Sequence, residues 1–251
     1  MIGRTAVTIA AEFTISRGRL MARMPRLAVA GQPHLVIQRS GVQAAFLDNE
    51  DRHVYLESLR EVSRGGIADV HAYALLDDGV LLLVSPREAA DLGRLMQRVN
   101  RRYVAAFHRR HGGSGALWGG RFQAAALEPE RYLLRCISMI EQAPVRAGIV
   151  TLATEWQWSS ARHHSGLGTS PILTEHDAWW RTGNTPFERE AKHEVGLQRG
   201  LRDDEFNELL NAARGGWPLG SADFVSAVEK SSHRTARPRP RGRPRLNKVA
   251  I

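Results

Sequence analysis

The chain has 251 residues, of which 43% are hydrophobic and 24% charged, and it carries a formal net charge of +9. This composition predicts a folded protein with one large domain, or one domain and a smaller unit, and argues against a disordered chain. A single cysteine, Cys136, excludes an intramolecular disulfide and a cysteine-based zinc site, and no stretch approaches the roughly 20 apolar residues of a membrane span.

The positive charge is concentrated near the C-terminus. Residues 230–251 contain eight Lys or Arg and no Asp or Glu, which leaves +1 for residues 1–229. A basic tail indicates a polyanionic partner, and a solvated tail without a function is the alternative interpretation. At the other end, residues 1–20 are expected to be a disordered or non-native extension, because Met21 offers an alternative start.

Strand and helix signals alternate through the first two thirds of the chain. The expected elements are a strand at 34–39, a helix from about 49, strands at 69–76 and 80–84, a helix at 89–110, a strand at 122–127 and a helix at 129–141. Asp78-Gly79 between two of the strands is a strong hairpin signal. This order predicts an α+β fold of the ferredoxin-like type, an antiparallel sheet with helices on one face.

The character of the sequence changes beyond about residue 150. Short helices are expected near 186–199, 203–214 and 220–230, which we group as a helical appendage over residues 166–230. The main domain is then 21–165, and 231–251 is a basic tail.

Seven segments in the main domain together resemble one protein family. They lie at 31–39, 48–52, 71–73, 101–103, 117–122, 144–148 and 158–160. Because these segments occur together and in this order, the chain resembles the REP-associated tyrosine transposases, a branch of the HUH single-strand DNA transposases. The resemblance implies transposition and recombination of DNA from a mobile element, with Mg²⁺ or Mn²⁺ as the cofactor of active relatives.

The resemblance also implies where the chemistry of such an enzyme lies. Two histidines at i and i+2 of a strand face the same side and hold the divalent ion. A tyrosine on the helix after the fourth strand attacks the scissile phosphate, and a polar ligand one helical turn later shares its face.

In this chain the four positions carry other residues. The two histidine positions fall on Gly79 and Leu81, the tyrosine position on Met139 and the last ligand on Ala143. We therefore expect no catalytic residue, no metal ligand and no cofactor at these positions. Tyr132 lies about 10 Å from Met139 along the helix, too far to replace the tyrosine.

Other residues are candidates to replace the missing metal ligands. Asp77, Asp78 and Glu141 offer oxygen ligands for Mg²⁺, which keeps an active transposase with a rebuilt site as the alternative. His163-His164 is expected to be a solvent-facing pair. His71 is expected to be structural, and Cys136 to be a core residue.

Arginines are the candidates for DNA contact. On the helix expected at 89–110 one face carries Arg98, Arg101, Arg102 and Arg109, and Arg121 precedes the fourth strand. Such side chains meet phosphates without reading sequence, although a solvated helix face is an equal interpretation.

The tail offers a second DNA contact. Arg241 and Arg243 flank Gly242 between two prolines, as in an AT-hook that enters the minor groove of A·T-rich duplex DNA. The physical basis is a segment kept extended by proline, in which glycine lets the backbone lie deep in the groove.

These observations predict a transposase-family protein that binds hairpin or single-stranded DNA without cutting it. A homodimer is compatible with the sequence, no membrane partner is expected, and the expected setting is the bacterial cytoplasm, on the nucleoid. A decayed protein without a selected role is a further alternative.

Overall fold

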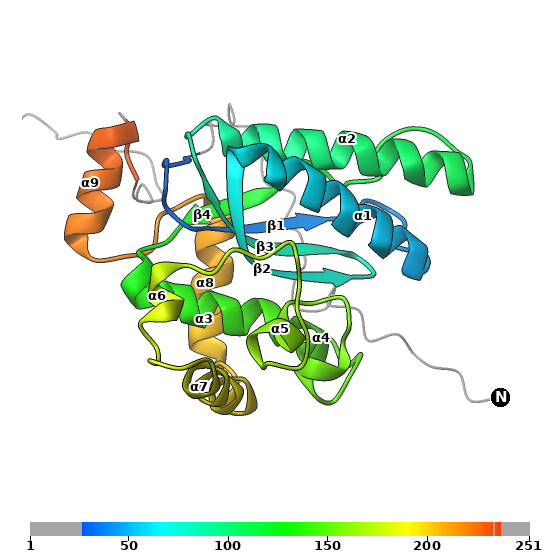
Figure 1. The fold of residues 1–251 in the computed structure, drawn as a ribbon. Helices are drawn as coiled ribbons and strands as arrows, with labels where there is room; N and C mark the ends of the chain where they lie inside the picture. Colours follow the sequence, from blue (N-terminus) through cyan, green and yellow to red (C-terminus); the bar gives the residue numbers. More distant parts are fainter. Residues whose placement is uncertain (1–26, 233, 237–251) are drawn as a thin grey trace, which may run out of the picture.

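The centre of the protein is a four-stranded antiparallel sheet with the strand order β2-β3-β1-β4 (Figure 1). The computed structural model describes residues 27–232 and 234–236. The strands are β1 (His34–Arg39), β2 (Ala68–Leu76), β3 (Gly79–Pro86) and β4 (Gln123–Ala126). This order and the antiparallel pairing confirm the expected α+β class and the ferredoxin-like sheet.

The two helices that connect the strands pack on one face of the sheet. They are α1 (Asn49–Val62) and α2 (Asp91–His111). The Asp48 side chain caps α1 by accepting a hydrogen bond from the Asp51 backbone N–H at 2.9 Å. After α1 the chain leaves the helix through η2 (Ser63–Ile67), in which Gly66 has a φ of 74°.

The opposite face of the sheet is also covered, which the sequence did not predict. There α3 (Pro129–Glu141) and α8 (Asp203–Gly215) lie below the sheet (Figure 1). The expected helices on one face of the sheet are confirmed as α1 and α2. The remaining helices are α4 (Ala143–Arg146), η3 (Ala153–Glu155), α5 (Ala161–His164), α6 (Asp177–Trp180), α7 (Pro186–Arg199) and α9 (Ala222–Ser232).

Alternation along β3 decides which residues face which layer. Val80, Leu82 and Val84 belong to the hydrophobic cluster under α1 and α2, whereas Leu81 and Leu83 join the cluster under α3 and α8. Gly79 shares the parity of Leu81, so both candidate positions on this strand face the α3 side.

Segments from outside the sheet lie along both of its edges. On the β2 edge, Leu173 bridges to Val70 and Ser159 bridges to Ala74. On the β4 edge, the backbone N–H of Leu219 donates to the carbonyl of Ala126 at 2.9 Å. The exposed backbone of each edge strand is thus partly satisfied by later parts of the chain.

The helices expected near 186–199, 203–214 and 220–230 are confirmed as α7, α8 and α9. In the part of the chain that the structure describes, no helix is long and apolar enough to cross a membrane. The expected extension at 1–20 lies outside the described residues, as does the tail expected at 231–251 from residue 237 onward.

Candidate functional site

The strand and helix positions that the resemblance assigns to metal and nucleophile lie in an apolar environment. Met139 on α3 is fully buried, and Leu81 on β3 packs against the same hydrophobic cluster. Ile37 and Ala74 belong to this cluster as well. The space between β3 and α3 is therefore filled by hydrocarbon and one thioether.

Gly79 has no room for a side chain. A Cβ atom built on it would lie well under 3.0 Å from the carbonyl oxygen of Gln38 and 3.1 Å from the Cα of Arg39. Both atoms belong to the backbone of β1, which pairs with β3 by the Arg39–Gly79 register. A histidine could enter this position only if β1 moved.

Ala143, the fourth position, is the first residue of α4 and is buried. None of the four side chains carries an oxygen or nitrogen that could ligate a divalent ion. The residues present do not fit the hydrated Mg²⁺ or Mn²⁺ that the resemblance implies.

Two of the three carboxylates that could form a rebuilt magnesium site are in ion pairs with arginines instead. Asp78 forms an ion pair with Arg39 at 2.9 Å, and Asp77 forms one with Arg52. Among the residues that the structure describes, neither aspartate joins a group of three potential ligands close enough to share an ion. Glu141, the third candidate, lies in a different cluster.

That cluster is a buried assembly of Glu141, His164 and His193. The Nδ1 of His164 lies 2.5 Å from Oε1 of Glu141, and the Nε2 of His193 lies 2.6 Å from Oε2. The hydroxyl of Ser160 donates to Oε1 at 2.6 Å. The expectation that His163-His164 faces solvent is therefore wrong for His164, whose side chain is 2% exposed.

Electrostatics inside this cluster favour the charged carboxylate. Burial alone would raise the pKa of Glu141, but the adjacent His164 and His193, through charge and hydrogen bonds, outweigh it and hold that pKa well below its ordinary value. The sequence signal for the cluster was weak, because Glu141 and His193 are 52 residues apart.

Three other residues singled out in the sequence have structural partners. His71 is buried, with Nδ1 2.6 Å from the Thr174 carbonyl oxygen and Nε2 2.7 Å from the Ser85 hydroxyl, as expected for a structural histidine. The Tyr132 hydroxyl donates to Glu208 at 2.8 Å. Cys136 is a buried core residue, and burial raises the pKa of its thiol.

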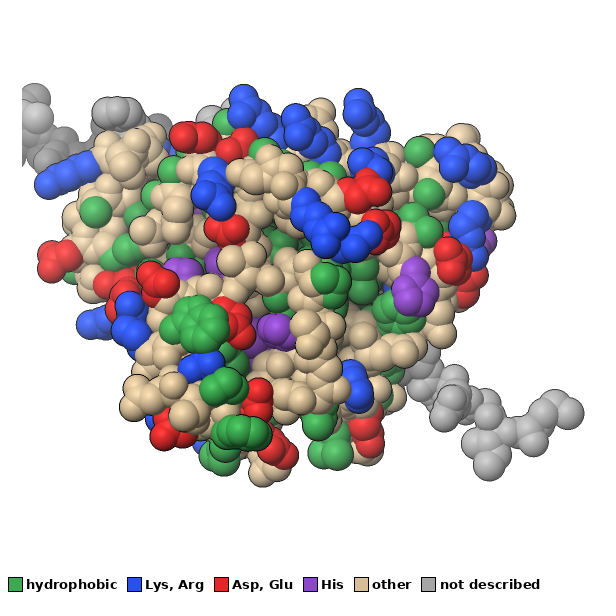
Figure 2. Space-filling model, in the orientation of Figure 1, with side chains coloured by type: hydrophobic (Ala, Val, Ile, Leu, Met, Phe, Trp, Pro, Cys, Tyr) green, Lys and Arg blue, Asp and Glu red, His purple; other side chains and the backbone are tan. Residues whose placement is uncertain are grey.

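The outer face of α2 carries several exposed arginines. Lys and Arg side chains gather along the edge of the molecule over this helix in Figure 2. Arg98, Arg101 and Arg109 are exposed and, among the described residues, form no ion pair, whereas Arg102 pairs with Glu61. Arg121 is also exposed, just before β4.

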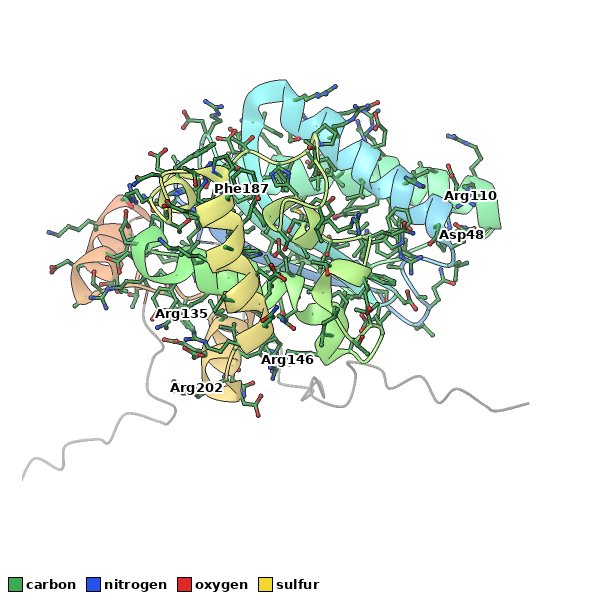
Figure 3. The ribbon with its side chains drawn as sticks, turned by 60° about the horizontal axis from the view of Figure 1, so that its bottom comes forward. Asp48, Arg110, Arg135, Arg146, Phe187 and Arg202 are labelled. Atoms are coloured by element: carbon green, nitrogen blue, oxygen red, sulfur yellow. The ribbon has the colours of Figure 1, made fainter. Side chains whose placement is uncertain are left out.

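A second cluster of titratable side chains, both acidic and basic, lies where the start of α1 meets the end of α2. Arg110 contacts the carboxylates of Asp48, at 2.9 Å, and Asp51, and Figure 3 shows Asp48 and Arg110 beside each other. His111 also contacts Asp51, at 2.8 Å. This arginine therefore belongs to the scaffold and not to the free basic face.

The structure does not bring the predicted DNA-contacting arginines to the four apolar positions. Arg98, Arg101, Arg102 and Arg109 lie on α2, on one side of the sheet, and Leu81 and Met139 lie on the other side. Arg241 and Arg243 lie outside the described residues.

Several of the segments that carry the sequence resemblance form backbone hydrogen bonds that hold loops against the sheet. The backbone N–H of Leu75 donates to the carbonyl of Trp158, and the N–H of Ser160 donates to the carbonyl of Tyr73, both at 2.9 Å. The N–H of Gly119 similarly donates to the carbonyl of Arg39 at 3.0 Å. These segments attach loops to the sheet, which requires no catalytic chemistry.

Arg146, within the segment 144–148, has a comparable role. Its guanidinium lies 4.2 Å from the ring centroid of Phe206 and donates to Asp203 at 2.5 Å. It therefore fastens the start of α8 to the end of α4.

Comparison with known proteins gives a likeness to a solved structure. No family model matches the chain, and no curated protein matches it. A solved structure described as the REP-associated tyrosine transposase bound to a REP hairpin is similar, with a TM-score of 0.51 and 17% identity, over 63% of this chain and 93% of that one. At this level of identity the likeness shows a shared fold.

Proposed function

We propose that the protein binds hairpin or single-stranded DNA through the outer face of α2 and does not cleave it. The observation that carries the proposal is the pair of Leu81 and Met139 in one buried apolar cluster, next to a Gly79 that has no space for a side chain. The structurally similar transposase was solved with a REP hairpin, which supports the choice of DNA.

The binding half of the proposal rests on the three exposed arginines of α2. Arg98 and Arg109 are 11 residues apart, which corresponds to about 16 Å along a helix. Three exposed guanidiniums over this length suit a run of backbone phosphates, which they would contact without reading base sequence. Arg121 is the fourth candidate contact.

The proposal that DNA is not cleaved rests on the lack of metal ligands and of a nucleophile at the positions that the resemblance implies. Positioning a divalent ion needs oxygen or nitrogen donors, and an attack on phosphorus needs a hydroxyl within reach. Leu81 and Met139 supply neither, and Ala143 is a buried methyl group. The tail is proposed to add affinity for A·T-rich duplex through Arg241 and Arg243.

We expect the triple variant Arg98→Ala, Arg101→Ala, Arg109→Ala to bind a labelled DNA hairpin more weakly. The slope of log affinity against log salt should shrink by about 3, close to one unit for each lost phosphate contact. Fluorescence anisotropy between low and moderate salt measures this slope.

The matched control replaces three exposed arginines of α3, α5 and α7, Arg131, Arg162 and Arg199, with alanine. Equal losses in the two triple variants would contradict a binding face on α2. Loss of all binding on Arg241→Ala, Arg243→Ala alone would indicate that only the tail contacts DNA and that the folded part has no such role.

We expect no cleavage and no covalent protein–DNA product when the full chain is incubated with hairpin DNA and Mg²⁺ or Mn²⁺. A denaturing gel with end-labelled DNA reports both products. Metal-dependent cutting by the natural protein would overturn the proposal and support an active transposase whose site lies elsewhere. Binding of the same hairpin in the same buffer shows that the substrate is engaged.

A further inference from the structure

The buried cluster of Glu141, His164 and His193 has the composition of a metal site. We propose that these three side chains bind one Zn²⁺ ion, or a similar borderline transition metal, and that the ion has a structural role. The metal positions that the resemblance implies lie elsewhere, on Gly79, Leu81 and Ala143.

The first argument is the convergence of three donors from three separate segments. Glu141 ends α3, His164 ends α5, and His193 lies in the middle of α7. One ligand atom from each lies within 4.8 Å of the others, and the side chains of all three residues are buried. Two imidazoles and one carboxylate form a donor set typical of zinc.

The second argument is that, among the described residues, no arginine or lysine contacts the Glu141 carboxylate. The groups that contact the Glu141 carboxylate are the two imidazoles and the Ser160 hydroxyl. In the other cluster of this kind, Asp48, Asp51 and His111, the guanidinium of Arg110 already lies among the ligands. The Glu141 cluster is therefore the better candidate for an ion.

The donor types decide the class of metal. Nitrogen ligands favour Zn²⁺ over Mg²⁺ or Ca²⁺, which prefer an all-oxygen shell. The present nitrogen–oxygen distances of 2.5 and 2.6 Å are shorter than those of charge-assisted N–H···O hydrogen bonds, about 2.7–2.9 Å. With Zn–N and Zn–O bonds of about 2.0–2.2 Å, the donors would have to move apart by several tenths of an ångström.

The surroundings indicate a structural role and an entry route. Trp179 lies against both imidazoles, with ring centroids 4.5 Å from His164 and 5.2 Å from His193, and shields them from water. A hollow of about 180 Å³ on the surface is lined by His193, Trp179 and Ser138, so an ion can approach from the α7 side. A buried ion here would join α5 and α7 to the end of α3 and could not meet a DNA phosphate.

The test is metal binding by the tag-free full chain after treatment with a chelator. Isothermal titration with Zn²⁺ should give one tight site per chain, and Co²⁺ should give the visible absorption of a four-coordinate nitrogen–oxygen site. Zn²⁺ should also raise the melting temperature. The variants Glu141→Gln and His193→Gln should each weaken this site by at least about tenfold, because each removes a donor to the metal.

Two control variants locate the site. His163→Gln changes the neighbouring histidine, whose Nε2 lies 3.7 Å from Glu175, and His111→Gln changes the other cluster. Both should bind Zn²⁺ as the natural chain does. Circular dichroism without metal shows whether each variant is folded, and if Glu141→Gln fails to fold, His193→Gln at the edge of the cluster gives the same comparison.

Two outcomes would overturn the proposal. If the natural chain binds no equivalent of Zn²⁺ or Co²⁺, the cluster is a metal-free hydrogen-bonded group. If zinc affinity is the same in the natural chain, Glu141→Gln and His193→Gln, the ion is bound elsewhere. Neither result bears on DNA binding, which the arginine variants test separately.

Discussion

The free energy of unfolding is expected to fall by about 3 kcal/mol for each of two histidines, His34 and His71, when the pH is lowered from 7 to 4. Burial lowers the pKa of each ring from 6.5 to about 4, although a backbone hydrogen bond opposes the shift. Between these values the unfolded chain binds protons that the folded protein does not. Stability from this source is therefore fully present above about pH 6.5 and is lost as the pH falls towards 4.

The contacts of His34 explain why its ring resists protonation. Its Nδ1 donates to the carbonyl oxygen of Gln32 at 2.7 Å, and its Nε2 accepts from the Val29 backbone N–H at 3.2 Å. A second ring proton would point at that N–H donor. His71 is less constrained, because its Nε2 faces the Ser85 hydroxyl, which can rotate and accept.

Urea unfolding at pH 7, 5.5 and 4 measures the effect. In His34→Gln the dependence of stability on pH should become weaker by up to about 1.4 kcal/mol per pH unit in this window, since one titrating group is removed. Gln97→Ala, at an exposed residue of α2 that does not titrate, should keep the natural dependence. Identical pH profiles for the natural chain and His34→Gln would contradict the assignment.

Gly79→Ala is expected to lower the free energy of unfolding by about 1–3 kcal/mol, the range for side chains forced into filled space. The added methyl group would meet the backbone of Gln38 and Arg39 and not a flexible side chain, so β1 would have to shift. Gly79→His should be at least as damaging. Restoring a histidine here therefore requires more than the substitution itself.

Chemical denaturation of Gly79→Ala beside Gly93→Ala provides the comparison. Gly93 lies in α2 with no atom within 4 Å of an added Cβ, so alanine there should leave stability unchanged or raise it by up to about 1 kcal/mol. Equal stability of the two variants would show that β1 yields easily, and the argument from lack of space would fail.

Local patterns made the sheet and its main helices predictable. The Asp78-Gly79 turn, the apolar stripe of α2 and the proline that starts α3 are each set by neighbouring residues. The expected helix at 129–141 has the observed bounds of α3. The side of the sheet on which α3 lies was not predictable in this way, because it depends on packing partners more than 60 residues later, in α8.

The candidate site was only partly predictable for the same reason. Adjacent histidines look alike in a sequence, and only the approach of α7 shows that His164 is buried with Glu141 while His163 is not. The lack of space at Gly79 depends on the register of β1 against β3, which no local pattern encodes. The apolar character of Leu81 and Met139, by contrast, could be inferred directly from residue type.

The covered edges of the sheet limit how two copies of this chain can associate. A second molecule that added a strand beside β2 would have to displace Leu173 and Ser159, which already bridge to it. Beside β4, which is only four residues long, Leu219 already pairs with the end of the strand. Strand addition is therefore obstructed at both edges, and a dimer that used α2 instead would hide the arginines from DNA.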